Sequence, residues 1–93
     1  MYDLEIKPKA DKIFSKLAKK NPKQLMIIGK KIKEIRKNPF GYKFLRKPLH
    51  SFNRVHIDKH FVLIFKIDRQ KKIIDIYSFD HHDKAYLWRE KKK

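Results

Sequence analysis

The segment from residue 61 to 67 limits the possible folds of this chain more than any other. It reads Phe-Val-Leu-Ile-Phe-Lys-Ile, with Lys66 as its one polar residue. A nearly continuous apolar run of this length is typical of a strand in the middle of a sheet. The polar connections on either side of it, residues 58–60 and 68–71, have the length of hairpin loops. The sequence therefore predicts a central strand flanked by its two neighbours in the chain, residues 54–58 and 72–79.

The first part of the chain predicts one further strand and two helices. Residues 2–6 alternate apolar with acidic side chains, as in a short half-buried strand. Pro8 suits the first turn of a helix, and Asn21 followed by Pro22 suits the start of a second one, which ends at Asn38-Pro39. Gly29 interrupts the second helix, which predicts the close approach of another element. The apolar positions of the two helices recur at helical spacing: Ala10, Ile13, Phe14, Leu17 and Ala18, then Leu25, Ile28, Ile32 and Ile35.

These elements predict an α+β fold with the order β-α-α-β-β-β and a short C-terminal helix from about Asp83. A helical hairpin packs on one face of an antiparallel sheet, and the other face is open to a partner. We expect residues 1–93 to form a single domain, because a chain of this length has one modest core. The sequence contains no apolar run long enough for a membrane helix, no secretory leader and no cysteine, which favours a cytoplasmic protein.

The charge of the chain predicts a polyanionic partner. Lys and Arg total 26 against 10 acidic residues, a net charge of +16. Nucleic acid, the ribosome or an acidic protein would each be attracted, although a solvated basic surface is the simpler alternative. A membrane partner is not expected, since neither helix pairs its basic face with aromatic anchors. The residues predicted to bind RNA or the ribosome lie on the second helix and the following loop: Lys30, Lys33, Arg36, Lys37, Lys43, Arg46 and Lys47.

Five residues are candidates for catalysis of RNA cleavage. Alternation places Arg54 and His56 on one face of their strand, and His81, His82 and Tyr86 follow the last strand. Histidine can accept or donate a proton near neutral pH, arginine can bind phosphate through two hydrogen bonds, and tyrosine can hydrogen-bond or stack on a base. Each has a simpler alternative: a surface histidine, an arginine paired with an acid, or a tyrosine that packs on the sheet.

No cofactor and no metal site are predicted. The two adjacent histidines match none of the zinc-binding spacings, and neighbouring side chains of a strand point to opposite faces. The chain has only two glycines, Gly29 and Gly41, and hence no glycine-rich phosphate loop.

The order and length of these segments resemble the RelE/ParE toxin superfamily of toxin–antitoxin modules. The likeness spans nearly the whole chain, and the ending His81-His82-Asp83-Lys84-Ala85-Tyr86 is similar to the terminal motif of RelE-type members. The resemblance implies the toxin of a type II module: a metal-free endoribonuclease that cleaves mRNA in the ribosomal A site. It also implies a heteromeric complex with a cognate RelB-like antitoxin that neutralises the toxin.

Two positions depart from the RelE pattern. The arginine usual at the start of the central strand is replaced by His60-Phe61, and the one often found at the end of the last strand is replaced by Asp80. Either the histidines and the basic loop take over, or the activity is weak, altered or lost. Two alternatives therefore stay open: a ParE-like inhibitor of DNA gyrase, and an RNA- or ribosome-binding module without catalysis.

Overall fold

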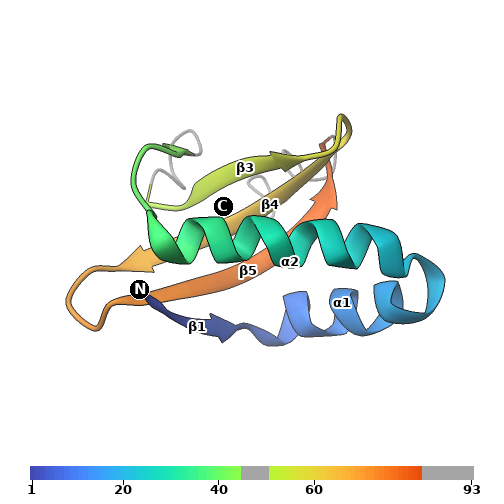
Figure 1. The fold of residues 1–93 in the computed structure, drawn as a ribbon, viewed down its shortest axis with the longest axis horizontal. Helices are drawn as coiled ribbons and strands as arrows, with labels where there is room; N and C mark the ends of the chain where they lie inside the picture. The colour runs from blue at the N-terminus through green and yellow to red at the C-terminus, as the bar shows by residue number, and fades with distance from the viewer. Residues whose placement is uncertain (45–50, 83–93) are drawn as a thin grey trace, which may run out of the picture.

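The computed structural model describes residues 1–44 and 51–82 and shows two helices and one five-stranded sheet (Figure 1). The α+β class and the predicted order of the main elements are confirmed. The predicted C-terminal helix from Asp83 lies outside the described residues. In chain order the elements are β1 (Asp3–Ile6), α1 (Pro8–Lys20), α2 (Pro22–Lys37), β2 (Lys43–Phe44), β3 (Asn53–Ile57), β4 (Phe61–Asp68) and β5 (Ile73–His81).

The strands follow the order β1-β5-β4-β3-β2, so the apolar strand β4 is central, as its composition predicted. The prediction of a wholly antiparallel sheet is wrong, because β1 pairs with β5 in parallel. The chain reverses at the helical hairpin, between α2 and β3, and at the β3–β4 and β4–β5 hairpins, and this even number of reversals brings β5 back in the direction of β1 (Figure 1). The two-residue strand β2 was predicted as part of a loop, and it pairs antiparallel with β3.

The helix boundaries follow from local sequence signals. Pro8 and Pro22 each occupy the first turn of a helix, where a missing N–H costs nothing. The Asn21 side chain accepts a hydrogen bond from the Gln24 N–H at 3.1 Å, so Asn21 is the predicted N-cap of α2. The second helix ends at Lys37, before Asn38-Pro39, as predicted. No helix among the described residues is long and apolar enough to cross a membrane.

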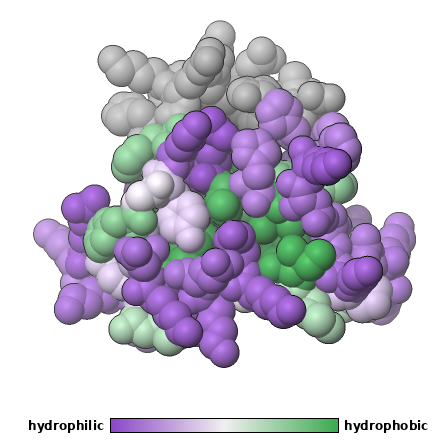
Figure 2. Space-filling model, turned by 45° about the horizontal axis from the view of Figure 1, so that its top comes forward, coloured by the Kyte–Doolittle hydropathy of each residue, from purple (hydrophilic) through white to green (hydrophobic). Residues whose placement is uncertain are grey.

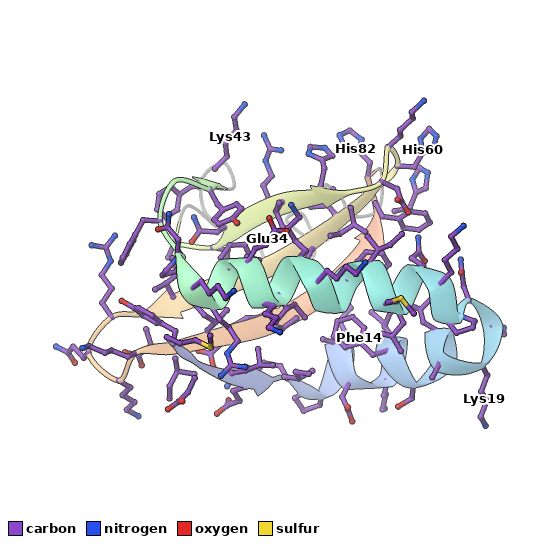
Figure 3. The ribbon with its side chains drawn as sticks, viewed as in Figure 1. Phe14, Lys19, Glu34, Lys43, His60 and His82 are labelled. Atoms are coloured by element: carbon purple, nitrogen blue, oxygen red, sulfur yellow. The ribbon has the colours of Figure 1, made fainter. Side chains whose placement is uncertain are left out.

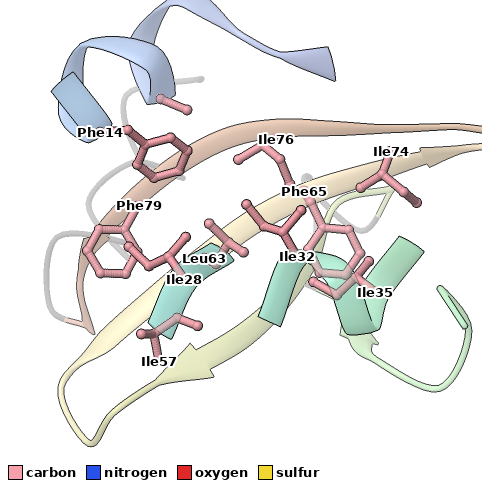
Figure 4. Close-up of a cluster of buried hydrophobic side chains, with 11 residues drawn as sticks. Phe14, Ile28, Ile32, Ile35, Ile57, Leu63, Phe65, Ile74, Ile76 and Phe79 are labelled. Carbon is pink, nitrogen blue, oxygen red and sulfur yellow. The ribbon is translucent and has the colours of Figure 1, made fainter. Parts of the chain in front are cut away.

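The main core lies between the helical hairpin and one face of the sheet (Figure 4). The helices supply the apolar stripes that their periodicity predicted, and the sheet supplies alternate residues of β3, β4 and β5. The buried side chains of this cluster are Ala10, Phe14, Ile28, Ile32, Ile35, Ile57, Leu63, Phe65, Ile74, Ile76 and Phe79.

A bulge in β5 changes which side chains of this strand face the helices. Ile64 pairs with Ser78, but the next residue, Phe65, pairs with Ile76, so Tyr77 is an extra residue in β5. Before the bulge the even-numbered residues Ile74 and Ile76 join the core. After it the odd-numbered Phe79 does so.

The second face of the sheet is less open than predicted. Val62 and Ile64 are buried there, with Phe52 and Tyr77 packed against them. The Phe52 and Tyr77 rings meet edge to face with centroids 4.8 Å apart. The middle of this face is therefore a small second core.

Candidate active site

The candidate site begins with three basic side chains on neighbouring strands. Lys43 of β2 pairs with Arg54 of β3 in the sheet register, and His56 follows Arg54 by two residues on the same face. The two-residue strand β2 is what places Lys43 there. All three line a depression of about 230 Å³, together with Gly41, Tyr42 and Val55. Three groups that can carry positive charge around one hollow suit a phosphate.

His82 joins this face from the other side of the central strand. Its ring lies 5.7 Å from that of His56, centroid to centroid, with an angle of 24° between the planes. The backbone N–H of His82 donates a hydrogen bond to the carbonyl oxygen of His60 at 2.6 Å, which holds the end of β5 against the start of β4. Lys43, His60 and His82 project on the side of the molecule away from α1 and Lys19 (Figure 3).

The surroundings of His56 favour its neutral form. Partial burial lowers the pKa of the His56 imidazole below its usual value of 6.5, and the nearby positive charges of Arg54, His82 and Lys43 lower it further. A neutral imidazole at pH 7 can accept a proton. The His56 residue is nevertheless exposed to solvent, so a substrate can reach the side chain.

His81 lies apart from this pair, although the sequence grouped it with the catalytic candidates. Its ring lies 6.0 Å from that of His60, with the planes 2° apart, and 5.6 Å from the ring of Phe61. His81, the last residue of β5, follows Phe79 by two residues on the face of the main core, and it is His82, just beyond the strand, that meets His56. Three other predicted site residues, Tyr86, Arg46 and Lys47, lie outside the described residues.

Asp80 occupies the face of Arg54 and His56, and sequence reasoning did not identify its contacts. Asp80 pairs in register with Val62, which pairs with His56 on the other side. Its carboxylate accepts a hydrogen bond from the Ser78 hydroxyl at 2.6 Å and lies 3.6 Å from the ammonium of Lys9. The Ser-x-Asp spacing was the available signal, since residues two apart share one face of a strand. These contacts engage an acidic side chain that alternation places next to the histidine pair.

The basic residues predicted on the second helix lie across the sheet from the histidine pair. Lys30, Lys33 and Lys37 are exposed on α2, whereas His56 and His82 are on the face without helices. Arg36 is half-buried and also makes a structural contact. Its Nε–H donates a hydrogen bond to the Tyr2 carbonyl oxygen at 2.7 Å, and the Tyr2 N–H donates one to the Arg36 carbonyl oxygen at 3.0 Å.

An apolar groove lies between β1, at the edge of the sheet, and the helix α2. It has a volume of about 400 Å³, and Lys33 and Arg36 lie at its polar margin. The prediction that another element approaches Gly29 is wrong, since a Cβ placed on this glycine meets no atom within 4 Å. Leu4 and Ile6 remain 37% exposed, which is more than a half-buried strand predicts. The apolar lining residues are Met1, Leu4, Ile6, Phe14, Leu25, Ile28 and Ile32.

The surface that surrounds these features is mostly hydrophilic. Figure 2 shows polar side chains over most of the face in view, with hydrophobic atoms in gaps between them. Within residues 1–44 and 51–82, no group of three or more histidine, cysteine, aspartate or glutamate side chains is placed to hold a metal ion.

Solved structures that share this fold include a toxin and a toxin–antitoxin complex. A YoeB/ParE toxin from Agrobacterium tumefaciens superposes with a TM-score of 0.78 at 10% identity, covering 86% of this chain and 98% of its own. The toxin–antitoxin complex RelBE2 from Mycobacterium tuberculosis matches with a TM-score of 0.73 at 20% identity, over 87% of this chain and 98% of the matched chain. The fold is therefore that of RelE/YoeB-type toxins.

The sequence comparison shows the family. The chain is 52% identical over 86 residues to a protein of Methanocaldococcus jannaschii that bears the name "Putative toxin RelE4", covering 92% of both chains. No protein-family model matches the sequence. At this identity and coverage the chain belongs to the RelE toxin family, as its sequence pattern had indicated, and it is the toxin of a toxin–antitoxin module of this type.

Proposed function

We propose that this toxin is an endoribonuclease that cleaves mRNA in the A site of the translating ribosome, in the cytoplasm and without a metal ion. The observation that carries the proposal is the His56–His82 pair, with ring centroids 5.7 Å apart beside Arg54 and Lys43. RNA cleavage through the 2′-hydroxyl needs a proton acceptor, a proton donor and cations for the phosphate. The described residues supply all of these on one face of the sheet.

In this mechanism His56 is the general base. Its lowered pKa keeps the imidazole neutral near pH 7, so it can take the proton of the ribose 2′-hydroxyl. The 2′ oxygen then attacks the adjacent phosphorus. A new bond between this oxygen and phosphorus forms as the bond to the 5′ oxygen of the next nucleotide breaks, which leaves a 2′,3′-cyclic phosphate.

His82 is the general acid, and the two cations stabilise the charge that develops on the phosphate. The His82 imidazolium gives its proton to the departing 5′ oxygen. In each cleavage His56 therefore gains one proton and His82 loses one. Arg54 can donate two parallel hydrogen bonds to the phosphoryl oxygens, and Lys43 adds a point charge. Arg54 and Lys43 together occupy the role of the arginines that RelE-type members usually carry on the central and last strands.

The test is to map mRNA 5′ ends on ribosomes after expression of the wild type, His56→Ala, His82→Ala and the control His60→Ala. We expect cuts inside codons for the wild type and the control, and a loss of at least about 100-fold for the first two variants, as is usual for general acid–base groups. Equal cleavage by His56→Ala would refute the mechanism. Growth arrest without cuts would instead support inhibition of gyrase, and RNA binding without arrest or cuts a non-catalytic module.

We also propose that the apolar groove between β1 and α2 receives a segment of the cognate RelB-like antitoxin. The groove joins an apolar floor to the basic margin of Lys33 and Arg36, which suits an amphipathic helix with acidic flanks. Leu4→Arg should weaken the complex, because it places a charge in the groove. Met26→Arg is the matched control, since Met26 is 63% exposed and does not line the groove. Equal affinity of both variants, measured by titration calorimetry, would place the antitoxin elsewhere.

A further inference from the structure

An arginine lies over an exposed aromatic ring at the end of the molecule opposite to the α1–α2 turn. The central carbon of the Arg69 guanidinium is 4.8 Å from the centre of the Phe40 ring. Arg69 is in the turn between β4 and β5, and Phe40 follows the end of α2, so the pair joins segments that are far apart in the chain. Figure 1 shows this turn, the N-terminus and the end of α2 together at one end of the molecule.

The ring of Phe40 is held in place without being buried. The Tyr2 ring meets it edge to face, with centroids 6.2 Å apart and planes 86° apart. Tyr2 is in turn held to α2 by its two hydrogen bonds with Arg36. Phe40 is nevertheless 45% exposed, whereas Phe65 of the main core is 0% exposed. An aromatic ring that stays at the surface with a guanidinium over it offers a flat surface for stacking.

The turn that carries Arg69 is basic, and its backbone is fixed. Residues 69–72 read Arg-Gln-Lys-Lys, and all four are exposed. The Asp68 carboxylate accepts a hydrogen bond from the Lys71 N–H at 3.0 Å, and the Asp3 N–H donates one to the Lys72 carbonyl oxygen at 2.9 Å. The turn therefore presents three cationic side chains from a backbone that is tied to β1, next to the Phe40 ring.

We propose that Phe40 and Arg69 form a binding subsite for an unpaired base of RNA, with Lys71 and Lys72 as contacts for its phosphates. Single-stranded RNA binds where a basic surface carries flat side chains, because every base can stack on an aromatic ring or a guanidinium plane. Phe40 lies three residues before Lys43, so their Cα atoms are at most about 11 Å apart. The inference rests on the proposed cleavage of mRNA for the identity of this RNA, and the subsite holds a nucleotide near the one that is cut.

The experiment measures fluorescence anisotropy of a labelled single strand of about 10 2′-O-methyl ribonucleotides with the full-length chain. The 2′-O-methyl group removes the attacking hydroxyl, so the probe stays intact whether or not the protein is a nuclease. Phe40→Leu should lower the affinity by about 5- to 100-fold, the usual effect of losing one base–aromatic stack, and Phe40→Trp should retain it. Arg69→Gln should weaken binding more than Lys19→Gln, which removes the same charge at the far end of the helical hairpin (Figure 3).

Circular dichroism establishes that each variant is folded under the conditions of the assay. The proposal is overturned if the wild type does not bind the strand at low salt, or if Phe40→Leu binds it as tightly as the wild type. Equal losses in Arg69→Gln and Lys19→Gln would also overturn it, because binding would then depend on net charge alone. A duplex RNA as sensitive to Phe40→Leu as the single strand would do the same, since paired bases cannot stack on the ring.

The subsite and the proposed nuclease activity can fail separately. A protein that binds the single strand through Phe40 but cuts no mRNA would support the subsite and refute the nuclease. A protein that cuts mRNA while Phe40→Leu binds the strand with full affinity would refute the subsite alone.

Discussion

The two glycines of this chain should respond in opposite directions to the same substitution. Gly29 lies inside α2, and a Cβ added there meets no atom within 4 Å. Gly29→Ala should therefore stabilise the protein, because alanine favours a helix by about 1 kcal/mol over glycine and limits the unfolded chain. For a domain of this size, about 1 kcal/mol corresponds to a rise in Tm of about 4–8 °C.

Gly41 provides the matched control, since a Cβ there also meets nothing within 4 Å. Its φ is +97°, however, and residues other than glycine rarely adopt this backbone conformation. Gly41→Ala should destabilise the protein by about 1–2 kcal/mol through backbone strain. The two substitutions add the same methyl group into equally open space, so only the backbone conformation separates their effects.

Thermal and urea denaturation, followed by circular dichroism at one pH and salt concentration, measures both differences. A Gly29→Ala variant less stable than the wild type would refute the reasoning, because a methyl group would then meet something in the groove. An unchanged Gly41→Ala variant would show that residue 41 does not hold a left-handed conformation. Equal shifts of the same sign would refute both.

Three further effects follow from the described contacts. Burial and neighbouring positive charge lower the pKa of His56 in the folded protein. Just below pH 6.5 the folded protein therefore binds fewer protons than the unfolded chain, and it loses stability as the pH falls through that value. His56→Gln should remove this loss in urea titrations at pH 7.5 and 5.5, and an unchanged pH dependence would contradict it. Phe65→Ala should lower the free energy of unfolding, measured by urea denaturation, by about 3–5 kcal/mol, because Phe65 is fully buried in the main core. A decrease below about 1 kcal/mol would show that the core closes over the cavity. Arg36→Met should lower the free energy of unfolding by about 1 kcal/mol and speed amide exchange in β1, since it removes the hydrogen bond to the Tyr2 carbonyl oxygen. Unchanged amide exchange would count against that role of Arg36.

Local signals in the sequence were sufficient for the helices and the central strand. The cap at Asn21, the prolines at helix starts and the apolar run of β4 act over a few residues, so the chain alone shows where these elements begin and end. The same is true of the shared face of Arg54 and His56, which alternation predicts directly. The family pattern was also present in the order of these elements, and the comparison at 52% identity bears it out.

The pairing of β1 with β5 and the groove beside Gly29 were decided by the tertiary structure. Both depend on where the helical hairpin lies against the sheet, which no local pattern contains. The charge of Arg36 could be read from the sequence, whereas its hydrogen bond, which joins α2 to residue 2, could not. Contacts between distant segments of this kind follow from packing.

The bulge at Tyr77 is the clearest case of a choice made in three dimensions. The sequence supplies two adjacent histidines at the end of β5 and does not say which of them meets His56. One extra residue in the strand exchanges the two faces, so that Phe79 joins the main core and His82 lies beside His56. The bulge exists only relative to β4, because an extra residue is defined by the register of the partner strand. The sequence therefore determines which groups are available for chemistry, and the pairing of β4 with β5 determines which of them meet.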